Sequence, residues 1–147
     1  MLTTRILLTG FIIACVGQAS ANVSHINHGV VVKGSTPFSE IVKVNNTLYL
    51  SGQVGLVPET QKLISGGVAE ETRQTMDNIN AVLISQGYQL NDVVKCTVFL
   101  DDMKDFTAFN DVYKQYFSSE RLPARSTVGV NGLALNAKVE IECLAAK

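Results

Sequence analysis

The sequence has 147 residues, of which 46% are hydrophobic and 17% charged, and it contains only 3 prolines. This composition is typical of a globular domain and excludes a disordered or collagen-like chain. The formal net charge of −1 gives no cationic excess for gripping a phosphate backbone, which argues against a nucleic-acid partner. Three cysteines without a CxxC pair, and two scattered histidines, exclude a zinc finger and a cysteine-rich disulfide framework.

The first 21 residues have the layout of a secretory signal peptide. Arg5 precedes the apolar run Ile6 to Val16, and Ala19-Ser20-Ala21 supplies the small residues that signal peptidase requires. The apolar run is too short to span a bilayer as a stable helix. We therefore expect an exported protein, periplasmic or secreted, whose mature domain runs from Asn22 to Lys147. Loss of Arg5 lowers the formal charge of that domain to −2.

A second processing route stays open at the same end of the chain. Ile12-Ile13-Ala14-Cys15 is similar to a bacterial lipobox, which would leave Cys15 as a lipidated amino terminus on a membrane. A cytosolic protein with an apolar first strand is disfavoured, because it has no use for an arginine, an apolar run and Ala-x-Ala in this order. Soluble export is the favoured interpretation.

The first half of the mature sequence predicts a β-hairpin and a helix. Strands 41–44 and 47–50 flank Asn45-Asn46, a dipeptide that tolerates left-handed backbone. Apolar residues at helical spacing then predict a helix over 68–86, which Gly87 can cap.

The second half predicts three strands and an aromatic helix. Residues 93–100 are mostly apolar, as in a strand covered on both faces, and 125–130 and 139–145 are two further strands. The helix between them presents one aromatic face, formed by Phe106, Phe109, Tyr113, Tyr116 and Phe117. This order predicts an α+β fold, a mixed sheet with two helices packed on one face. The other face of the sheet then needs a partner.

No disulfide is predicted between Cys96 and Cys143. Both cysteines fall on predicted strands, where a buried cysteine is more often a small core residue than a bonded one.

The last two strands carry a sided group of charges. Arg125 and Thr127 share one face of their strand, and Glu140 and Glu142 share one face of theirs. If the two strands pair as a hairpin closed around residues 132–135, matching apolar with apolar places all four on a common face. The two carboxylates repel, so a partly buried one should have a raised pKa and could act as an acid or base. The alternative is a solvated hairpin face decorated with ion pairs.

Three further polar features have weaker interpretations. Asn110 lies beside the aromatic face of the second helix, where a ligand contact competes with ordinary hydrogen bonding. Ser51 lacks the Gly-x-Ser-x-Gly context of a nucleophile elbow, so covalent serine catalysis is not expected. His25 and His28 have no carboxylate or cysteine at ligand spacing, and no metal site is predicted.

Six motifs from about Phe38 to the C-terminus occur in an order and spacing that are specific together. They are Leu48-Tyr49-Leu50-Ser51-Gly52-Gln53; Gln74-x-x-Asp77-Asn78 followed by Gly87; Asp92-Val93-Val94-Lys95 leading to Val98-Phe99-Leu100; Phe109-Asn110-x-x-Tyr113; Leu122-Pro123-Ala124-Arg125-Ser126-Thr127-Val128; and Val139-Glu140-Ile141-Glu142. Together they resemble the Rid family (the RidA or YjgF group) of enamine/imine deaminases.

The resemblance implies a chorismate-mutase-like (YjgF-like) α+β domain that forms a homotrimer with ligand sites between subunits. The implied activity is hydrolysis of short 2-enamino/2-imino acids to 2-keto acids and ammonia, with no cofactor or metal. It assigns Arg125 to carboxylate binding and Glu140 to acid/base catalysis. The remaining substrate-binding residues it implies are Ser51, Asn110, Thr127 and Phe38.

The sequence departs from the family pattern at two positions. The usual Gly-Pro-Tyr is Thr36-Pro37-Phe38 here, so Phe38 keeps the ring and lacks the hydroxyl. The glycine expected in the hairpin after Pro58 is replaced around Gln61. Two rival functions stay open: a non-catalytic trimer that binds small carboxylates or keto acids, and a ribonuclease, which the charge of −2 and the export signal disfavour.

Overall fold

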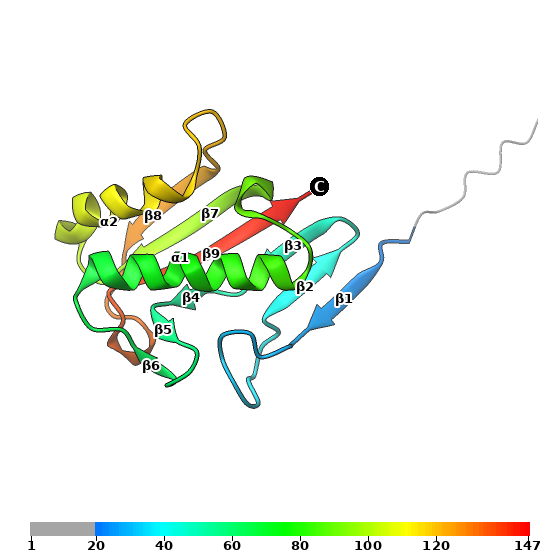
Figure 1. The fold of residues 1–147 in the computed structure, drawn as a ribbon, viewed down its shortest axis with the longest axis horizontal. Helices are drawn as coiled ribbons and strands as arrows, with labels where there is room; N and C mark the ends of the chain where they lie inside the picture. The colour runs from blue at the N-terminus through cyan, green and yellow to red at the C-terminus, as the bar shows by residue number, and fades with distance from the viewer. Residues whose placement is uncertain (1–19) are drawn as a thin grey trace, which may run out of the picture.

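The computed structural model describes residues 20–147, so the predicted signal segment and the lipobox cysteine lie outside the described residues. Seven strands form one mixed sheet in the order β1-β2-β3-β9-β7-β8, and β4 also pairs with β9 (Figure 1). A separate two-stranded hairpin consists of β5 and β6. The strand bounds are β1 (Val23–Ile26), β2 (Ile41–Val44), β3 (Thr47–Leu50), β4 (Gln53–Val54), β5 (Leu56–Val57), β6 (Lys62–Leu63), β7 (Val93–Leu100), β8 (Ala124–Gly129) and β9 (Val139–Ala146).

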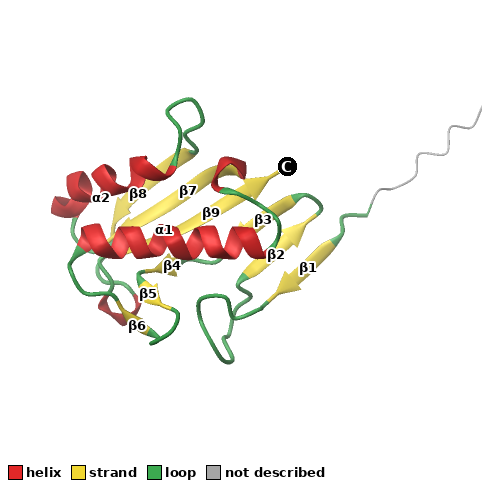
Figure 2. Ribbon diagram, in the orientation of Figure 1, coloured by secondary structure: helices red, strands yellow, loops and turns green. Residues whose placement is uncertain are grey.

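Two helices, α1 (Val68–Ser85) and α2 (Phe106–Tyr113), lie on the same face of the sheet (Figure 2). Short 3₁₀ turns flank α2, and others precede β7 and β9: they are Leu90–Asp92, Met103–Asp105, Lys114–Tyr116 and Ala134–Asn136. The predicted α+β fold with two helices on one face is therefore confirmed. Among residues 20–147, no helix is long and apolar enough to cross a membrane.

The turn residue and the helix-ending glycine predicted from the sequence adopt the expected backbone conformations. Asn45 adopts a left-handed backbone with φ 51 in the predicted β2–β3 turn. Gly87, with φ 73, ends α1, and its N–H donates to the carbonyl of Ile84 while that of Tyr88 donates to Leu83. These bonds satisfy carbonyls that the end of the helix would otherwise leave unpaired.

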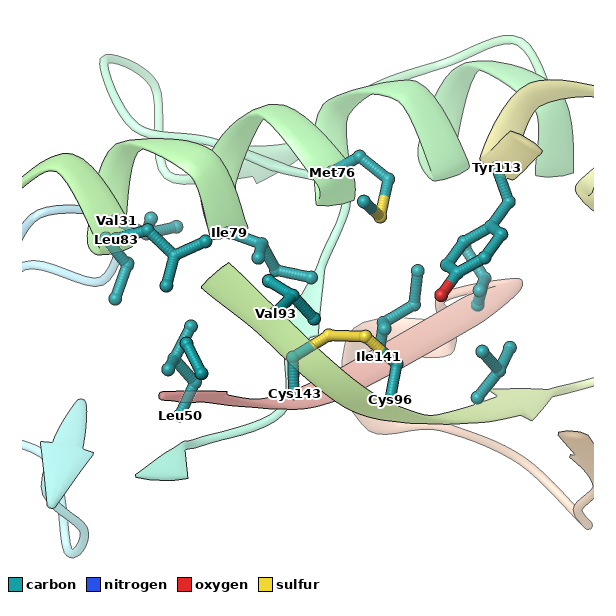
Figure 3. Close-up of a cluster of buried hydrophobic side chains, with 14 of the residues drawn as sticks. Val31, Leu50, Met76, Ile79, Leu83, Val93, Cys96, Tyr113, Ile141 and Cys143 are labelled. Atoms are coloured by element: carbon teal, nitrogen blue, oxygen red, sulfur yellow. A yellow bond between two sulfur atoms is a disulfide. The ribbon is translucent and has the colours of Figure 1, made fainter. Parts of the chain in front are cut away.

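The core lies between the sheet and the helices. Met76 and Ile79 point from α1 toward β7 and β9 (Figure 3). From α2, the predicted aromatic face contributes Phe109 and Tyr113, which are buried. Burying side chains of this size contributes about 1.5–3 kcal/mol each, which makes this layer the main source of stability.

The structure contains a disulfide between Cys96 and Cys143, a pairing that the sequence left open and did not favour (Figure 3). The two residues are direct partners across the antiparallel β7–β9 pair, with Cα atoms 4.2 Å apart. Both point into the helix-covered core, where Cys96 is 0% exposed and Cys143 2%. The bond forms because sheet register places the thiols together, and strand content alone does not reveal this register.

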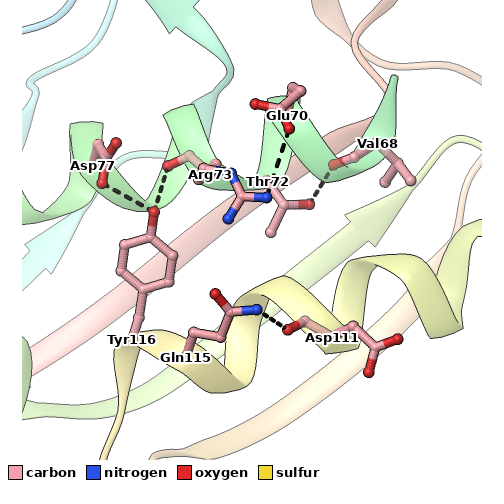
Figure 4. Close-up of polar contacts among 8 residues, drawn as sticks. All are labelled: Val68, Glu70, Thr72, Arg73, Asp77, Asp111, Gln115 and Tyr116. Carbon is pink, nitrogen blue, oxygen red and sulfur yellow. Dashed lines mark hydrogen bonds and ion pairs between the residues drawn. The ribbon is translucent and has the colours of Figure 1, made fainter. Parts of the chain in front are cut away.

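A polar contact fixes the second helical segment against the first (Figure 4). Tyr116 lies in the turn after α2. Its hydroxyl can donate to either of two acceptors on α1, the Arg73 carbonyl at 3.1 Å and Asp77 Oδ1 at 3.0 Å. Burial and the neighbouring Asp77 raise the pKa of Tyr116 to about 12, so the phenol stays a donor at neutral pH. This contact holds the aromatic segment in place above β8.

The last two strands do not pair with each other, and the predicted 125–130/139–145 hairpin is wrong. β8 pairs in parallel with β7, and β9 pairs with the opposite edge of β7. The chain leaves β7, passes through α2 and returns as β8. A strand–helix–strand crossover of this kind joins parallel neighbours.

Candidate functional site

The parallel pairing separates the charges that were expected to share a face. Arg125 and Thr127 lie opposite Cys96 and Val98 of β7, which places them on the helix-covered side. Glu140, by contrast, lies opposite Phe99, on the side away from the helices. The alternation along each strand was predicted correctly, and the common face was not.

The predicted substrate-contacting residues divide between two cavities, except that Thr127 lines neither. Ser51, Phe38 and Glu140 line a cavity of about 490 Å³. Asn110 and Arg125 line another, of about 340 Å³. The structure therefore brings the predicted residues together in two sets, and it does not bring the sets together within one chain. We call them the glutamate half-site and the arginine half-site.

In the glutamate half-site, Glu140 lies directly over the backbone of Gly52. Gly52 sits between β3 and β4, where the chain shifts its pairing along β9. A Cβ on Gly52 would collide with Glu140 Oε1. The glycine therefore leaves the space that the carboxylate occupies.

The environment of Glu140 shifts its acidity in the predicted direction. Burial raises the pKa of the Glu140 carboxyl, and the charge of Glu142 on the same strand face raises it further. Neither carboxylate forms an ion pair with another described residue, so nothing offsets the two effects. A carboxyl with a raised pKa is a better proton acceptor than an ordinary glutamate and can return the proton it takes.

Ser51 presents an acceptor to the same cavity. Its hydroxyl donates to the carbonyl of Ser39 at 2.7 Å. A hydroxyl has one hydrogen to donate and two lone pairs, so the remaining capacity of Ser51 is as an acceptor. It can bind a water molecule beside Glu140, while its own proton is donated to the Ser39 carbonyl and not to a base.

In the arginine half-site, Arg125 rests on the aromatic face of α2. Its guanidinium carbon lies 4.9 Å from the ring centre of Tyr113, 5.5 Å from that of Phe109 and 6.0 Å from that of Phe106. Within residues 20–147, Arg125 forms no ion pair. Cation–π contacts stabilise the charge without using its N–H donors, so the planar fork is available to an anion.

Two buried polar atoms near this cavity lack partners. Among the described residues, Tyr113 Oη and Thr127 Oγ1 make no hydrogen bond. Burial raises the pKa of Tyr113 to about 12, against a smaller opposing effect of Arg125, so its hydroxyl keeps its proton. An unpaired buried hydroxyl costs about 1–3 kcal/mol.

Sequence reasoning missed several residues that shape the two cavities. Gly52 and Leu135 in the glutamate half-site, and Tyr113 in the arginine half-site, were not assigned to the site. The Ser51-Gly52 pair could have signalled a close backbone approach, since a glycine after a strand often marks one. No local pattern marks Leu135. His25 and His28 were not predicted to bind metal, and no group of three or more ligand-type side chains gathers among residues 20–147.

Comparison with known proteins identifies the family. Residues 30–147 match the model of the family described as Endoribonuclease L-PSP. The chain belongs to this family. A relative from Capra hircus, named 2-iminobutanoate/2-iminopropanoate deaminase, is 47% identical over 109 residues, which cover 74% of this chain and 79% of that protein.

Solved structures of the family agree with the fold. RidA from the Antarctic bacterium Psychrobacter sp. PAMC 21119 is 37% identical, with a TM-score of 0.78 over 84% of this chain and 99% of that one. E. coli TdcF with bound serine is 31% identical, with a TM-score of 0.77 over 84% of this chain and 98% of that one. The Rid-family resemblance and the YjgF-like fold are thus confirmed.

Proposed function

We propose that the protein hydrolyses reactive 2-enamino/2-imino acids to 2-keto acids and ammonia. The observation that carries the proposal is Glu140, a carboxyl with a raised pKa held over Gly52 beside a serine acceptor. The names of the relatives, 2-iminobutanoate/2-iminopropanoate deaminase and Reactive Intermediate Deaminase A, support it at 45–47% identity.

The residues divide the chemistry between binding and proton transfer. Arg125 binds the substrate carboxylate through two parallel hydrogen bonds, a geometry that a lysine cannot copy. Glu140 takes a proton from a water as its oxygen bonds to the C=N carbon, and it returns a proton to the nitrogen. Glu140 then carries the proton of the new hydroxyl to the amino nitrogen; the C–N bond breaks, ammonia leaves and the C=O bond of the keto acid forms. General acid/base catalysis of this kind contributes roughly 10² to 10⁴ in rate.

The working enzyme is proposed to be a homotrimer in which one subunit supplies Arg125 and its neighbour Glu140. Within one chain these residues lie on strands that are roughly 10 Å apart, three positions out of step along β7, and on opposite faces of the sheet. No single small imino acid can contact both across the sheet. The face away from the helices also exposes Tyr49 and Val128, apolar surface that association would bury. Asn110 and Thr127 join the site from the arginine side, and Ser51 and Phe38 from the glutamate side.

Export is proposed as well, and two features of the described residues support it. β1 begins at Val23, next to the predicted mature terminus, and the Asn22 N–H donates to Asn45 Oδ1 at 3.0 Å. The Cys96–Cys143 disulfide is of a kind that persists in oxidising compartments and is rare in the cytosol. Intact-mass analysis of the protein from its native host tests this. A chain starting at Asn22 is expected, and a lipid-modified chain starting at Cys15 would place it on a membrane instead.

The activity is tested on imino acids made in situ by an amino-acid oxidase. Ammonia and keto acid should appear faster than in the uncatalysed reaction, in proportion to enzyme. Saturable binding of the keto acid without any acceleration would instead support the non-catalytic carboxylate binder. Salt-dependent RNA cleavage by the purified protein would support the ribonuclease alternative.

A further inference from the structure

The cavity beside Glu140 has an apolar wall that the hydrolysis itself does not use. Val32, Phe38, Val54, Leu56 and Leu135 contribute to it. Glu140 is the only charged residue among those that line this cavity, and no cation of the described chain faces it there. Ligand sites are commonly built this way, with a few polar groups at the reacting atoms and apolar surface around the rest of the ligand.

Leu135 is the unexpected member of this wall. It adopts a left-handed backbone with φ 60 and ψ 14, and its side chain is 63% exposed. A left-handed backbone favours glycine or asparagine, and asparagine does follow at position 136 with φ 61. A leucine here combines backbone strain with exposed apolar surface. Both costs are offset if an apolar group covers the side chain.

The opposite side of the wall is held in place by Gln61. Its Nε2 donates to the carbonyls of Val31 at 2.8 Å and Pro58 at 2.9 Å, and its Oε1 accepts from the Lys33 N–H at 3.0 Å. Gln61 is itself left-handed, with φ 56, at the hairpin position where the family pattern has glycine. The bonds to Val31 and Lys33 tie the segment that carries Val32 to the β5–β6 hairpin, and the bond to Pro58 braces Gln61 within that hairpin. The apolar wall therefore exists before a ligand arrives.

We infer that this wall is the subsite for the substrate's side chain, with Leu135 and Phe38 as specificity-determining residues. The inference rests on the proposed deaminase function, which it deepens by naming the substrate class. The preferred substrates are 2-imino acids with a branched aliphatic or aromatic side chain. Methyl side chains leave the wall uncovered, and acidic ones bring a negative charge beside Glu140. Each methylene buried against the wall favours binding by about four-fold.

The experiment compares kcat/KM for imino acids made in situ from leucine, phenylalanine and alanine. The wild-type enzyme should favour the leucine-derived substrate over the alanine-derived one by about sixteen-fold, the effect of burying two of its three additional carbons at about four-fold each. Leu135→Asn suits the left-handed backbone and removes the apolar surface, so it should cut this ratio to near one. Ile84→Ala is the matched control, since Ile84 is 60% exposed and lies on α1 away from this cavity. It should leave the ratio unchanged.

Three results would overturn the inference. The first is a wild-type ratio near one. The second is a Leu135→Asn variant that keeps the ratio while sedimentation shows weakened association, which would make Leu135 an intersubunit packing residue. The third comes from calorimetry with the products: 4-methyl-2-oxopentanoate should bind more tightly than pyruvate, and equal affinities would contradict the subsite. If no imino acid is hydrolysed but this binding preference holds, the deaminase proposal fails and the subsite stands.

Discussion

The two half-sites differ in how they treat charge. Around Arg125 the protein supplies aromatic rings, which stabilise a cation while leaving its N–H groups free. Around Glu140 it supplies burial and a second carboxylate, which raise the cost of ionisation. In the proposed reaction, the arginine half-site attracts the substrate's anion and the glutamate half-site exchanges a proton. Because the two lie on opposite faces of the sheet, the proposed chemistry brings them together through a second subunit.

The strongest challenge to this division is Glu140→Gln. The change keeps shape and hydrogen bonding while removing the titrating proton, so turnover should fall by about 10² to 10⁴. Binding of the keto-acid product should be retained. Stopped assays at saturating imine, with spontaneous hydrolysis subtracted, give the rate. Unchanged turnover would mean that Glu140 has no acid/base role and only contributes to a solvated strand face.

Arg125→Lys tests the other half. One point charge replaces a planar fork, and the substrate carboxylate is no longer held in one orientation, so kcat/KM should fall by about 10². The loss should be confined to substrates that carry a carboxylate. Comparison with a carboxylate-free imine supplies the control, and an equal loss on both substrates would remove the carboxylate-binding role.

Tyr113 is expected to position Arg125 through its ring. Tyr113→Leu should raise KM about five-fold, or roughly 1 kcal/mol of lost cation–π interaction, with a smaller change in kcat. Tyr113→Phe keeps the ring and should restore KM. Phe117→Leu provides the control for a truncated core ring, since Phe117 stacks on Tyr113 and not on Arg125. A KM rise of the same size in Phe117→Leu would indicate general loosening of α2.

Mixing the two inactive variants examines the division between subunits directly. When Glu140→Gln and Arg125→Lys chains are unfolded and refolded together, random association should restore about a quarter of wild-type activity, the chance that both chains at a site contribute an intact group. Each variant refolded alone is the control. Failure of the mixture to exceed the separate variants, with trimers present by sedimentation, would place both groups in one subunit's site.

The smallest expected effect is on stability. Because the pKa of Glu140 is raised in the folded state, that state keeps a proton which the unfolded chain loses near pH 4.3, roughly the ordinary value for Glu. Ionised Glu140 therefore costs stability as the pH rises through the folded pKa. Glu140→Gln should melt slightly above the wild type at pH 7 and equal it at low pH. The reverse order at pH 7 would mean that Glu140 takes part in a stabilising ion pair.

The sequence was sufficient to predict the helices and strands and which side chains share a strand face. It was insufficient to predict which strands are neighbours in the sheet. The alternation of side chains correctly predicted that Arg125 accompanies Thr127 and that Glu140 accompanies Glu142. It could not show that β7 lies between the two strands, because sheet order depends on contacts distant in the chain. One signal was available: the helix between 100 and 124 favours a parallel crossover over a hairpin.

The same limit explains the other differences. The Cys96–Cys143 bond depends on the β7–β9 register, which periodicity does not contain. The position of Gly52 under Glu140 depends on the shift of pairing from β3 to β4 along β9. The left-handed Leu135 has no sequence mark, since leucine is a poor residue for that backbone. These residues lie where long-range contacts override local preference.

The oxidation state of the buried Cys96–Cys143 pair also indicates the redox conditions under which the protein folded. Its sulfur atoms belong to residues that are 0% and 2% exposed, so a thiol in the surroundings reaches the bond only when the sheet opens. The oxidation state is therefore set while the chain folds and is kept afterwards, whatever the redox conditions the native molecule later meets. If one cell contained both the disulfide form and the reduced dithiol form of the protein, the two forms would indicate folding in two different compartments.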